Sequence, residues 1–179
     1  MKKWHLYPVF LTLILVLAGG CDNSIDDITL PPGNGGTLTA IIDGQSFSVS
    51  GLLVSAEYQE IGTTVSSLFV GGATLPLGSS TEALVLAMVR TDSTAISSGD
   101  VFVGSDMTRL AAGEYTLDAA TVSVSALSAN ASFASMTVTS LDFTTGLVSG
   151  TFSFDAVDDN DPTKVYEVRD GVFTNIPLD

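Results

Sequence analysis

The sequence predicts an all-β protein, organised as a single antiparallel β-sandwich or partly closed β-barrel built from hairpins. From Thr37 to Asp179, short alternating runs of Val, Thr, Ser, Phe and Ile are separated by glycines and acidic turns, a pattern typical of β-strands. Two segments of this region form predicted hairpins that sort apolar and polar residues onto opposite faces. Its roughly 143 residues are enough to bury one hydrophobic core without disulfides.

The first predicted hairpin spans Thr37 to Ser50, because Asp43-Gly44 lies between two alternating runs and favours a two-residue turn. Pairing Ile42 with Gln45 fixes its register. The apolar face then holds the pairs Ala40–Phe47 and Leu38–Val49. The polar face holds Thr39–Ser48 and Thr37–Ser50.

Further strands are predicted in the middle of the chain, at Leu52–Tyr58, Val65–Ala73, Ala83–Arg90, Val101–Val103, Glu114–Leu117 and Thr121–Ser128. The segment Ala83–Arg90 is apolar on both faces, so we expect a central strand that is covered on both sides. The least regular part of the sequence lies between 91 and 117. We expect one helical turn there, near Asp106–Ala111.

The second predicted hairpin spans Ala134 to Ala156 and turns at Thr144-Thr145-Gly146. Placing Phe143 opposite Leu147 puts three pairs on one face: Val138–Phe152, Met136–Phe154 and Ala134–Ala156. The pair Thr137–Ser153 then lies on the opposite, polar face. A last strand, Val165–Asp170, is expected to lie beside this hairpin, with Tyr166 next to Ala156 and Val168 next to Phe154. Gly171 is expected to form a bulge after it.

The predicted core takes the inward residues of these strands, and its members are Leu38, Ile42, Phe47, Val49, Leu84, Leu86, Met88, Val138, Phe152, Phe154 and Val168.

The residues before the β region indicate export and lipid attachment. The apolar run from Val9 to Ala18 follows a basic start and is shorter than the about 20 residues that a spanning helix needs, which predicts a signal peptide. The segment Leu17-Ala18-Gly19-Gly20-Cys21 resembles the lipobox of bacterial lipoproteins. The resemblance implies that Cys21 is acylated and becomes the new N-terminus. The alternative is an ordinary secretory cleavage that leaves a free thiol.

Three regions are therefore expected: a signal peptide at 1–20, an acylated cysteine with a flexible acidic and Pro/Gly-rich tether at 21–36, and an antiparallel β domain at 37–179. The acidic residues 22–27 resemble the signal that sends some Gram-negative lipoproteins to the cell surface. Asp22 also resembles a signal for inner-membrane retention in enterobacterial lipoproteins. We expect a lipid-anchored protein of the outer membrane, with the leaflet and surface exposure left open.

Charge and composition exclude several functions. The chain carries 20 acidic and six basic residues, and after removal of the signal four basic residues remain against the same 20, a formal charge of −16. Nucleic acid is excluded as a partner, because binding it depends on Lys and Arg neutralising phosphates. The mature chain also keeps no His, no Trp and only the cysteine assigned to lipid. Ser-His-Asp and Cys-His nucleophile systems and His/Cys zinc sites are therefore excluded.

One acidic segment is a candidate metal site, and it is formed by Asp158, Asp159, Asn160 and Asp161. It lies in a predicted hairpin loop and offers the hard oxygen ligands that Ca²⁺ prefers. It lacks the glycine of an EF-hand loop, so a solvated acidic turn is the favoured alternative. We expect no cofactor other than this candidate Ca²⁺ and assign no catalytic residue.

Two other residue groups suggest sugar chemistry. Glu57, Glu60, Glu114 and Asp118 are candidates for a glycosidase-like acid and base pair, which needs a separation of about 5 to 9 Å. Nothing in the sequence brings them together. Three tyrosines, Tyr58, Tyr115 and Tyr166, are candidates for stacking on a sugar ring. Aromatic residues of alternating strands more often belong to the core, and we expect that here.

Three segments of the domain resemble a family of small secreted all-β bacterial lipoproteins, and they are 38–47 (LTAIIDGQSF), 150–154 (GTFSF) and 168–173 (VRDGVF). The resemblance implies a shared β fold and transfers no catalytic residue. The sequence therefore predicts a lipid-anchored, non-catalytic module of the cell envelope that binds or presents an extracellular glycan or protein. The alternatives are a carboxylate-based polysaccharide hydrolase and a structural component of the envelope or matrix.

Overall fold

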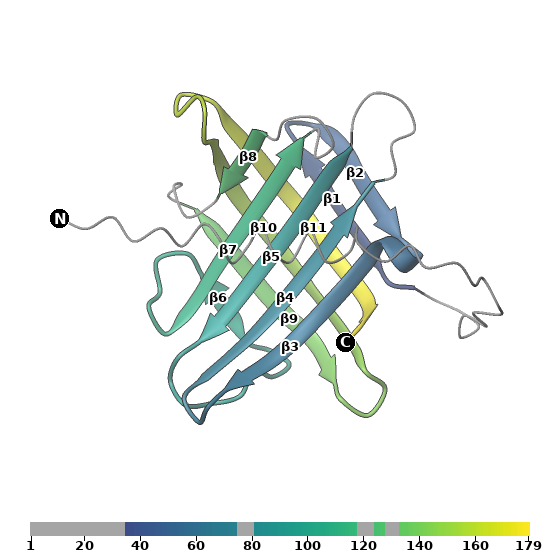
Figure 1. Cartoon of the computed structure of the whole chain (residues 1–179), viewed down its shortest axis with the longest axis vertical. Helices are drawn as coiled ribbons and strands as arrows, with labels where there is room; N and C mark the ends of the chain where they lie inside the picture. Colours follow the sequence, from purple (N-terminus) through teal and green to yellow (C-terminus); the bar gives the residue numbers. More distant parts are fainter. Residues whose placement is uncertain (1–34, 75–80, 118–123, 128–132) are drawn as a thin grey trace, which may run out of the picture. The chain divides into compact units, whose positions relative to one another are not determined.

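The computed structural model describes residues 35–74, 81–117, 124–127 and 133–179, and Asn34–Asp179 form one compact unit (Figure 1). The all-β prediction is confirmed. In the described residues the helical structure is a single 3-10 turn, η1 (Gly51–Leu53). The strands are β1 (Thr37–Ile42), β2 (Gln45–Ser50), β3 (Val54–Ile61), β4 (Val65–Ala73), β5 (Glu82–Arg90), β6 (Val101–Val103), β7 (Arg109–Leu117), β8 (Val124–Leu127), β9 (Ala134–Asp142), β10 (Leu147–Asp158) and β11 (Val165–Pro177).

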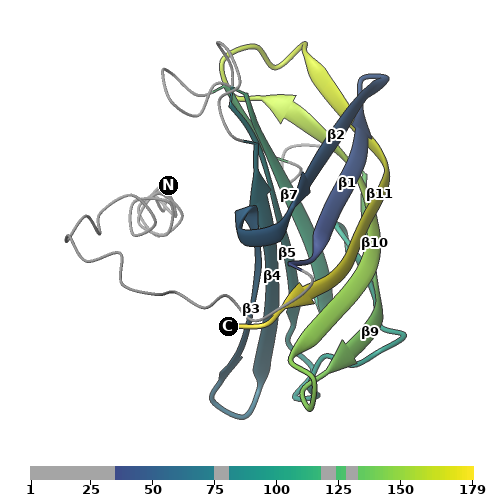
Figure 2. The same cartoon turned by 90° about the vertical axis from the view of Figure 1, so that its right-hand side faces the viewer.

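One mixed sheet contains these strands in the order β2-β1-β11-β10-β9-β6-β7-β5-β4-β3, and β8 pairs with both β10 and β7. All pairings are antiparallel except β6 with β7. The sheet folds over on itself into two facing layers, with β3, β4, β5 and β7 in one and β1, β2, β9, β10 and β11 in the other (Figure 2). The edge strands β2 and β3 do not pair with each other, and a parallel bridge joins Leu178 to Ala56 on β3. The domain is therefore a flattened, partly closed barrel.

The first hairpin has the predicted register in every pair, from Ile42–Gln45 to Thr37–Ser50. Asp43 and Gly44 have φ angles of 48° and 79°, as a two-residue hairpin turn of the primed type requires. The turn also contacts β11, because the Glu167 N–H donates to Asp43 Oδ1 at 2.8 Å. Gly35 and Gly36, expected at the end of the tether, pack on the domain, and the Gly36 carbonyl accepts the Gly51 N–H at 3.1 Å.

The register predicted for the second hairpin is wrong by two residues, since Phe152 lies opposite Met136 and Phe154 opposite Ala134. One residue of this shift arises at the turn, where Leu147 pairs with Asp142 and not with Phe143. Asp142 Oδ1 accepts the N–H groups of Thr144 and Thr145 there. The other residue of the shift is a bulge on β9. Ser149 and Gly150 are adjacent on β10, but their partners on β9, Ser140 and Val138, are two residues apart. A shift of two preserves the side-chain alternation, so both phenylalanines still face the core.

The last strand lies as predicted, with Phe154 opposite Val168 and Ala156 opposite Tyr166. It continues beyond the predicted end to Pro177, and its bulge falls at Arg169–Asp170, one residue before Gly171. Asp170 has a φ of 50°, in the left-handed region that Asp and Asn tolerate better than most side chains. The bulge points Arg169 and Asp170 toward the same outer face, because Val168 and Gly171 on either side are both buried.

Two predictions for the middle of the chain are wrong. The helical turn near Asp106–Ala111 is a turn and the start of β7 instead, since Asp106 Oδ1 accepts the Thr108 N–H at 2.8 Å and the strand begins at Arg109. β5 is not covered on both sides. Leu84, Leu86 and Met88 are fully buried on its inner face, whereas its outer valines, Val85 and Val89, stay partly exposed.

The predicted core is confirmed, since all eleven of its residues are buried. At its centre Phe152 stacks on Phe154 and on Phe173, with ring centroids 6.3 and 6.5 Å apart. Each ring lies against a glycine of a facing or neighbouring strand. A Cβ at Gly113 would lie 2.5 Å from the Phe154 ring, and one at Gly171 would lie 2.5 Å from the Phe152 ring. Gly150 makes the same close approach to Phe173.

One end of the barrel is closed by the loop between β5 and β6, which inserts Ile96 into the core with 1% exposure. Arg90 holds this loop. Its guanidinium donates to Asp92 at 2.7 Å and to Asp100 at 2.6 Å, and Asp100 Oδ2 also accepts the Ser97 N–H. Arg90 and Asp100 are both buried, so each depends on the other to offset its desolvation.

We expect Gly113→Ala to lower the free energy of unfolding by about 1 to 3 kcal/mol, because the new methyl group would overpack the fully buried Phe154 ring. Urea unfolding measures the loss. Gly71→Ala is the matched control, since its Cβ would meet its nearest neighbour at 3.7 Å, an ordinary contact. We expect that variant to change by less than about 0.5 kcal/mol. Equal losses in the two variants would contradict the close packing of Phe154 on Gly113.

The domain should also lose stability in acid through Asp92. The Arg90 guanidinium holds the pKa of the Asp92 carboxyl below its ordinary value. The Asp92 carboxyl therefore binds a proton less readily in the folded protein than in the unfolded chain, where the pKa of an Asp side chain is about 3.9. The resulting stability is present above that pH and is lost as the pH falls through the lowered value. Melting temperatures measured from pH 7 to 2.5 should fall less in Asp92→Asn than in the wild type, and parallel curves would exclude this contribution.

Candidate functional site

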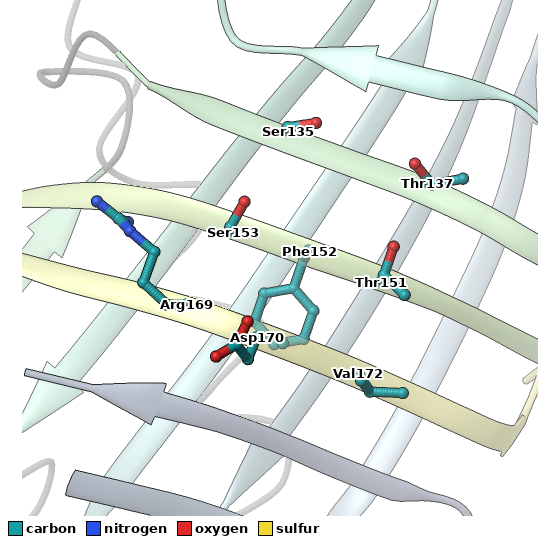
Figure 3. A pocket seen from close by; sticks show the side chains of 9 residues that line it. Ser135, Thr137, Thr151, Phe152, Ser153, Arg169, Asp170 and Val172 are labelled. Carbon is teal, nitrogen blue, oxygen red and sulfur yellow. The ribbon is translucent and has the colours of Figure 1, made fainter. Parts of the chain in front are cut away.

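A shallow groove of about 450 Å³ lies on the outer face of β9, β10 and β11 (Figure 3). Ser135 pairs with Ser153, and Thr137 pairs with Thr151, so four hydroxyl side chains form two rows across β9 and β10. Neighbouring strands lie about 4.8 Å apart. In the described residues none of these four hydroxyls has a hydrogen-bond partner, so all four are available to a ligand.

Alternation along β9 and β10 positions these hydroxyls. Met136 and Phe152 point inward and are buried, and the residues on either side of them therefore point outward. The sequence predicted a polar face of this hairpin, on which Thr137 and Ser153 both lie. It did not predict the groove, because the register and the neighbouring strand were needed to bring the two rows together.

The bulge on β11 adds an arginine and a carboxylate to the same groove. The Arg169 guanidinium donates to the carbonyls of Phe154 at 3.0 Å and Val168 at 3.1 Å, and it forms an ion pair with Asp155. It lies 5.5 Å from the centroid of the Phe133 ring, which is 43% exposed. These contacts fix the position of Arg169. Asp170 is exposed beside it and is the acidic side chain among the residues that line the groove.

The acidic loop predicted to bind calcium joins β10 to β11. Asp158 is buried, and its Oδ1 accepts the N–H groups of Asn160 at 2.9 Å and Asp161 at 3.3 Å. Asp161 accepts the Thr163 hydroxyl at 2.6 Å, and the Thr163 hydrogen bonds lower the pKa of this carboxyl. Burial and the neighbouring Asp158 raise the pKa of Asp159. Two carboxylates of the loop are therefore already engaged in turns of the backbone.

Across the described residues, the structure gathers no three His, Cys, Asp or Glu side chains at one point in a way that would hold a metal ion. The Ca²⁺ assignment to this loop stays a prediction.

The four carboxylates considered for acid and base catalysis are not brought together where the structure describes them. Glu57 and Glu60 are three residues apart on β3 and so point to opposite faces. Glu114 lies on β7, three strand spacings from β3, or about 14 Å. Asp118 lies outside the described residues.

The core assignment of two tyrosines is confirmed, because Tyr115 and Tyr166 are 4% and 5% exposed and their rings meet edge to face. Tyr58 is partly buried and packs against the core. Burial, followed by the hydrogen bond to Glu82, raises the pKa of Tyr115. None of the three lies in the groove.

Cys21, the predicted lipid attachment site, lies outside the described residues, so its acylation stays a prediction. In the part of the chain that the structure describes, no helix is long and apolar enough to cross a membrane. Comparisons with family models, curated proteins and solved structures found no match. The resemblances noted in the sequence remain expectations.

We expect any Ca²⁺ that the domain binds to bind at the Asp158–Asp161 loop, at millimolar concentration, because a divalent cation relieves the repulsion among its carboxylates. Calorimetry should show saturable heat, and Ca²⁺ should raise the melting temperature until EDTA removes it. Asp159→Asn should weaken both effects, whereas Asp106→Asn, in a turn elsewhere, should not. An unchanged melting temperature with no heat at millimolar Ca²⁺ would leave only a solvated turn.

Proposed function

We propose that this protein is a lipid-anchored component of the bacterial cell envelope that acts as a non-catalytic binding module, with the groove on β9, β10 and β11 as its binding face. The observation that carries the proposal is a set of four hydroxyls with no hydrogen-bond partner among the described residues, beside a fixed arginine and an exposed carboxylate. Such groups form directed hydrogen bonds with a ligand. The tether and the acylated Cys21 would hold the domain at the outer membrane.

The proposal of a non-catalytic role rests on residue chemistry. The mature chain has no His, so acid and base catalysis would depend on carboxylates. In the groove the ionisable side chains are Arg169 and Asp170, and a glycosidase needs two carboxylates about 5 to 9 Å apart on either side of a bond. A carboxylate-based polysaccharide hydrolase remains the catalytic alternative, and turnover of a glycan would identify it.

A second candidate function is a structural role in the envelope or matrix. The outer face of the layer that contains β4, β5 and β7 favours it. On β4, β5 and β7 the side chains of this face are mostly aliphatic or aromatic, and they include Phe69, Val85, Val89 and Leu110. The outer residues of β3, among them Glu57 and Gln59, are polar. An outer sheet face in contact with water is usually polar. Association of the delipidated domain with itself, seen by sedimentation, would support this candidate over the binding module.

The anchor can be tested in cells. We expect the wild-type protein to stay with the membrane fraction after a high-salt wash, and mass spectrometry to find an acylated N-terminal cysteine at position 21. Cys21→Ala should release the domain into the soluble fraction. Protease treatment of intact cells then shows whether the domain faces outward. An unmodified thiol at Cys21, or a soluble wild-type protein, would contradict lipid anchoring.

The binding face can be tested with the delipidated domain and crude extracellular material from the same cells. We expect Thr151→Arg, which fills the groove, to abolish retention on that material. Ser48→Arg, an exposed change on β2 outside the groove, is the matched control and should be retained like the wild type. Equal retention of the two variants would exclude the groove as the binding face.

A further inference from the structure

We propose that the groove on β9, β10 and β11 binds a neutral polysaccharide whose sugars carry adjacent hydroxyl groups, with Asp170 accepting two of those hydroxyls. The inference rests on the proposed binding function and specifies its ligand class. It depends on three features of the groove: its hydroxyl lining, the bulge that places Asp170 in it, and the charge around it.

The lining matches a hydroxylated ligand better than a protein surface. Ser135, Thr137, Thr151 and Ser153 each offer one donor and two acceptor positions, as sugar hydroxyls do. Protein interfaces gain most of their affinity from buried aromatic and arginine anchors in deep pockets. This groove is shallow and open, and Val172 is 40% exposed at its side. Among the described residues that line it, the one aromatic side chain is the buried Phe152. A ligand held here must therefore be recognised mainly through hydrogen bonds.

The bulge gives the groove one strong acceptor. Asp170 stands at a φ of 50° and points outward next to Arg169, although regular alternation would point it toward the core. An ionised carboxylate has two acceptor oxygens, and its hydrogen bonds are roughly twice as strong as neutral ones. Two oxygens on one carbon suit two hydroxyls on neighbouring carbons. Arg169 is held by two carbonyls and Asp155, and it is a hydrogen-bond donor fixed in the groove next to Asp170.

Charge excludes the acidic glycans. The domain from Thr37 to Asp179 contains 17 acidic and four basic residues, a formal charge of −13. Asp155, Glu167 and Asp170 lie on or beside the groove against the single charge of Arg169. This guanidinium is already paired with Asp155 and lies 3.6 Å from Glu167. A uronate or phosphate would meet net repulsion, whereas a neutral sugar would not.

Affinity electrophoresis of the delipidated domain in gels containing one polysaccharide each provides the test. Dextran and yeast mannan carry adjacent hydroxyls, linear β-1,3-glucan has none within its chain, and alginate is anionic. We expect dextran or mannan to retard the domain and the other two to leave it unretarded. Asp170→Asn should weaken the interaction at least tenfold, because it removes the charge while asparagine tolerates the same left-handed backbone. Thr151→Val should weaken it less, and Ser48→Ala should not change it.

A second measurement separates the ligand class from the proposed function. Periodate cleaves adjacent diols, so treating the crude extracellular material with periodate should abolish its retention of the domain, whereas protease treatment should not. Retention that survives periodate but is lost in Thr151→Arg would overturn the polysaccharide and keep the binding face. If the untreated material does not retain the wild-type domain, both proposals are overturned. Retardation that is unchanged in Asp170→Asn would overturn the role of Asp170, and release of sugar would identify a hydrolase instead.

Discussion

The packing of three phenylalanine rings on three glycines is the constraint on which the rest of this domain depends. Phe152, Phe154 and Phe173 stack along the middle of the barrel, and each ring occupies the space that a neighbouring Cβ would need. The Phe154 ring of β10 lies against bare backbone at Gly113 of β7, so the two layers can approach closely there without a void. The other two rings lie on glycines of the neighbouring strand in their own layer. The two layers are also in close contact at Gly72 on β4, where a Cβ would lie 2.6 Å from Val49 of β2.

The same constraint forms the groove on the outside. Gly171 must face inward so that the Phe152 ring can lie against it, and Val168 must also face inward to complete the core. Regular alternation cannot satisfy both, because the two residues are three apart. The extra residue is accommodated at Arg169–Asp170, and both side chains of the bulge then point to solvent. The arginine and the carboxylate of the groove are thus an outward consequence of how the core packs.

The two outer faces of the barrel differ in kind. Hydroxyl side chains dominate over β1, β2, β9 and β10, whereas aliphatic side chains dominate over β4, β5 and β7. Polar alternation explains the first face, since one side of an antiparallel sheet is usually in water. The second face departs from that pattern, and in a structural component it is the face through which the domain would associate with itself. Both faces cover the same core, into which the loop held by Arg90 inserts Ile96.

The sequence by itself determined the fold class, the first hairpin and the identity of the core, because these depend on local turn chemistry and on a side-chain period of two. Asp43-Gly44 leaves one register for its hairpin, and a shift of two in the second hairpin still left Phe152 and Phe154 inward. Only the tertiary structure decided where the β11 bulge falls, since the Phe152 ring of the neighbouring strand requires Gly171 to face inward. It also decided which hydroxyls become neighbours, because β9, β10 and β11 meet through pairings that no local pattern specifies.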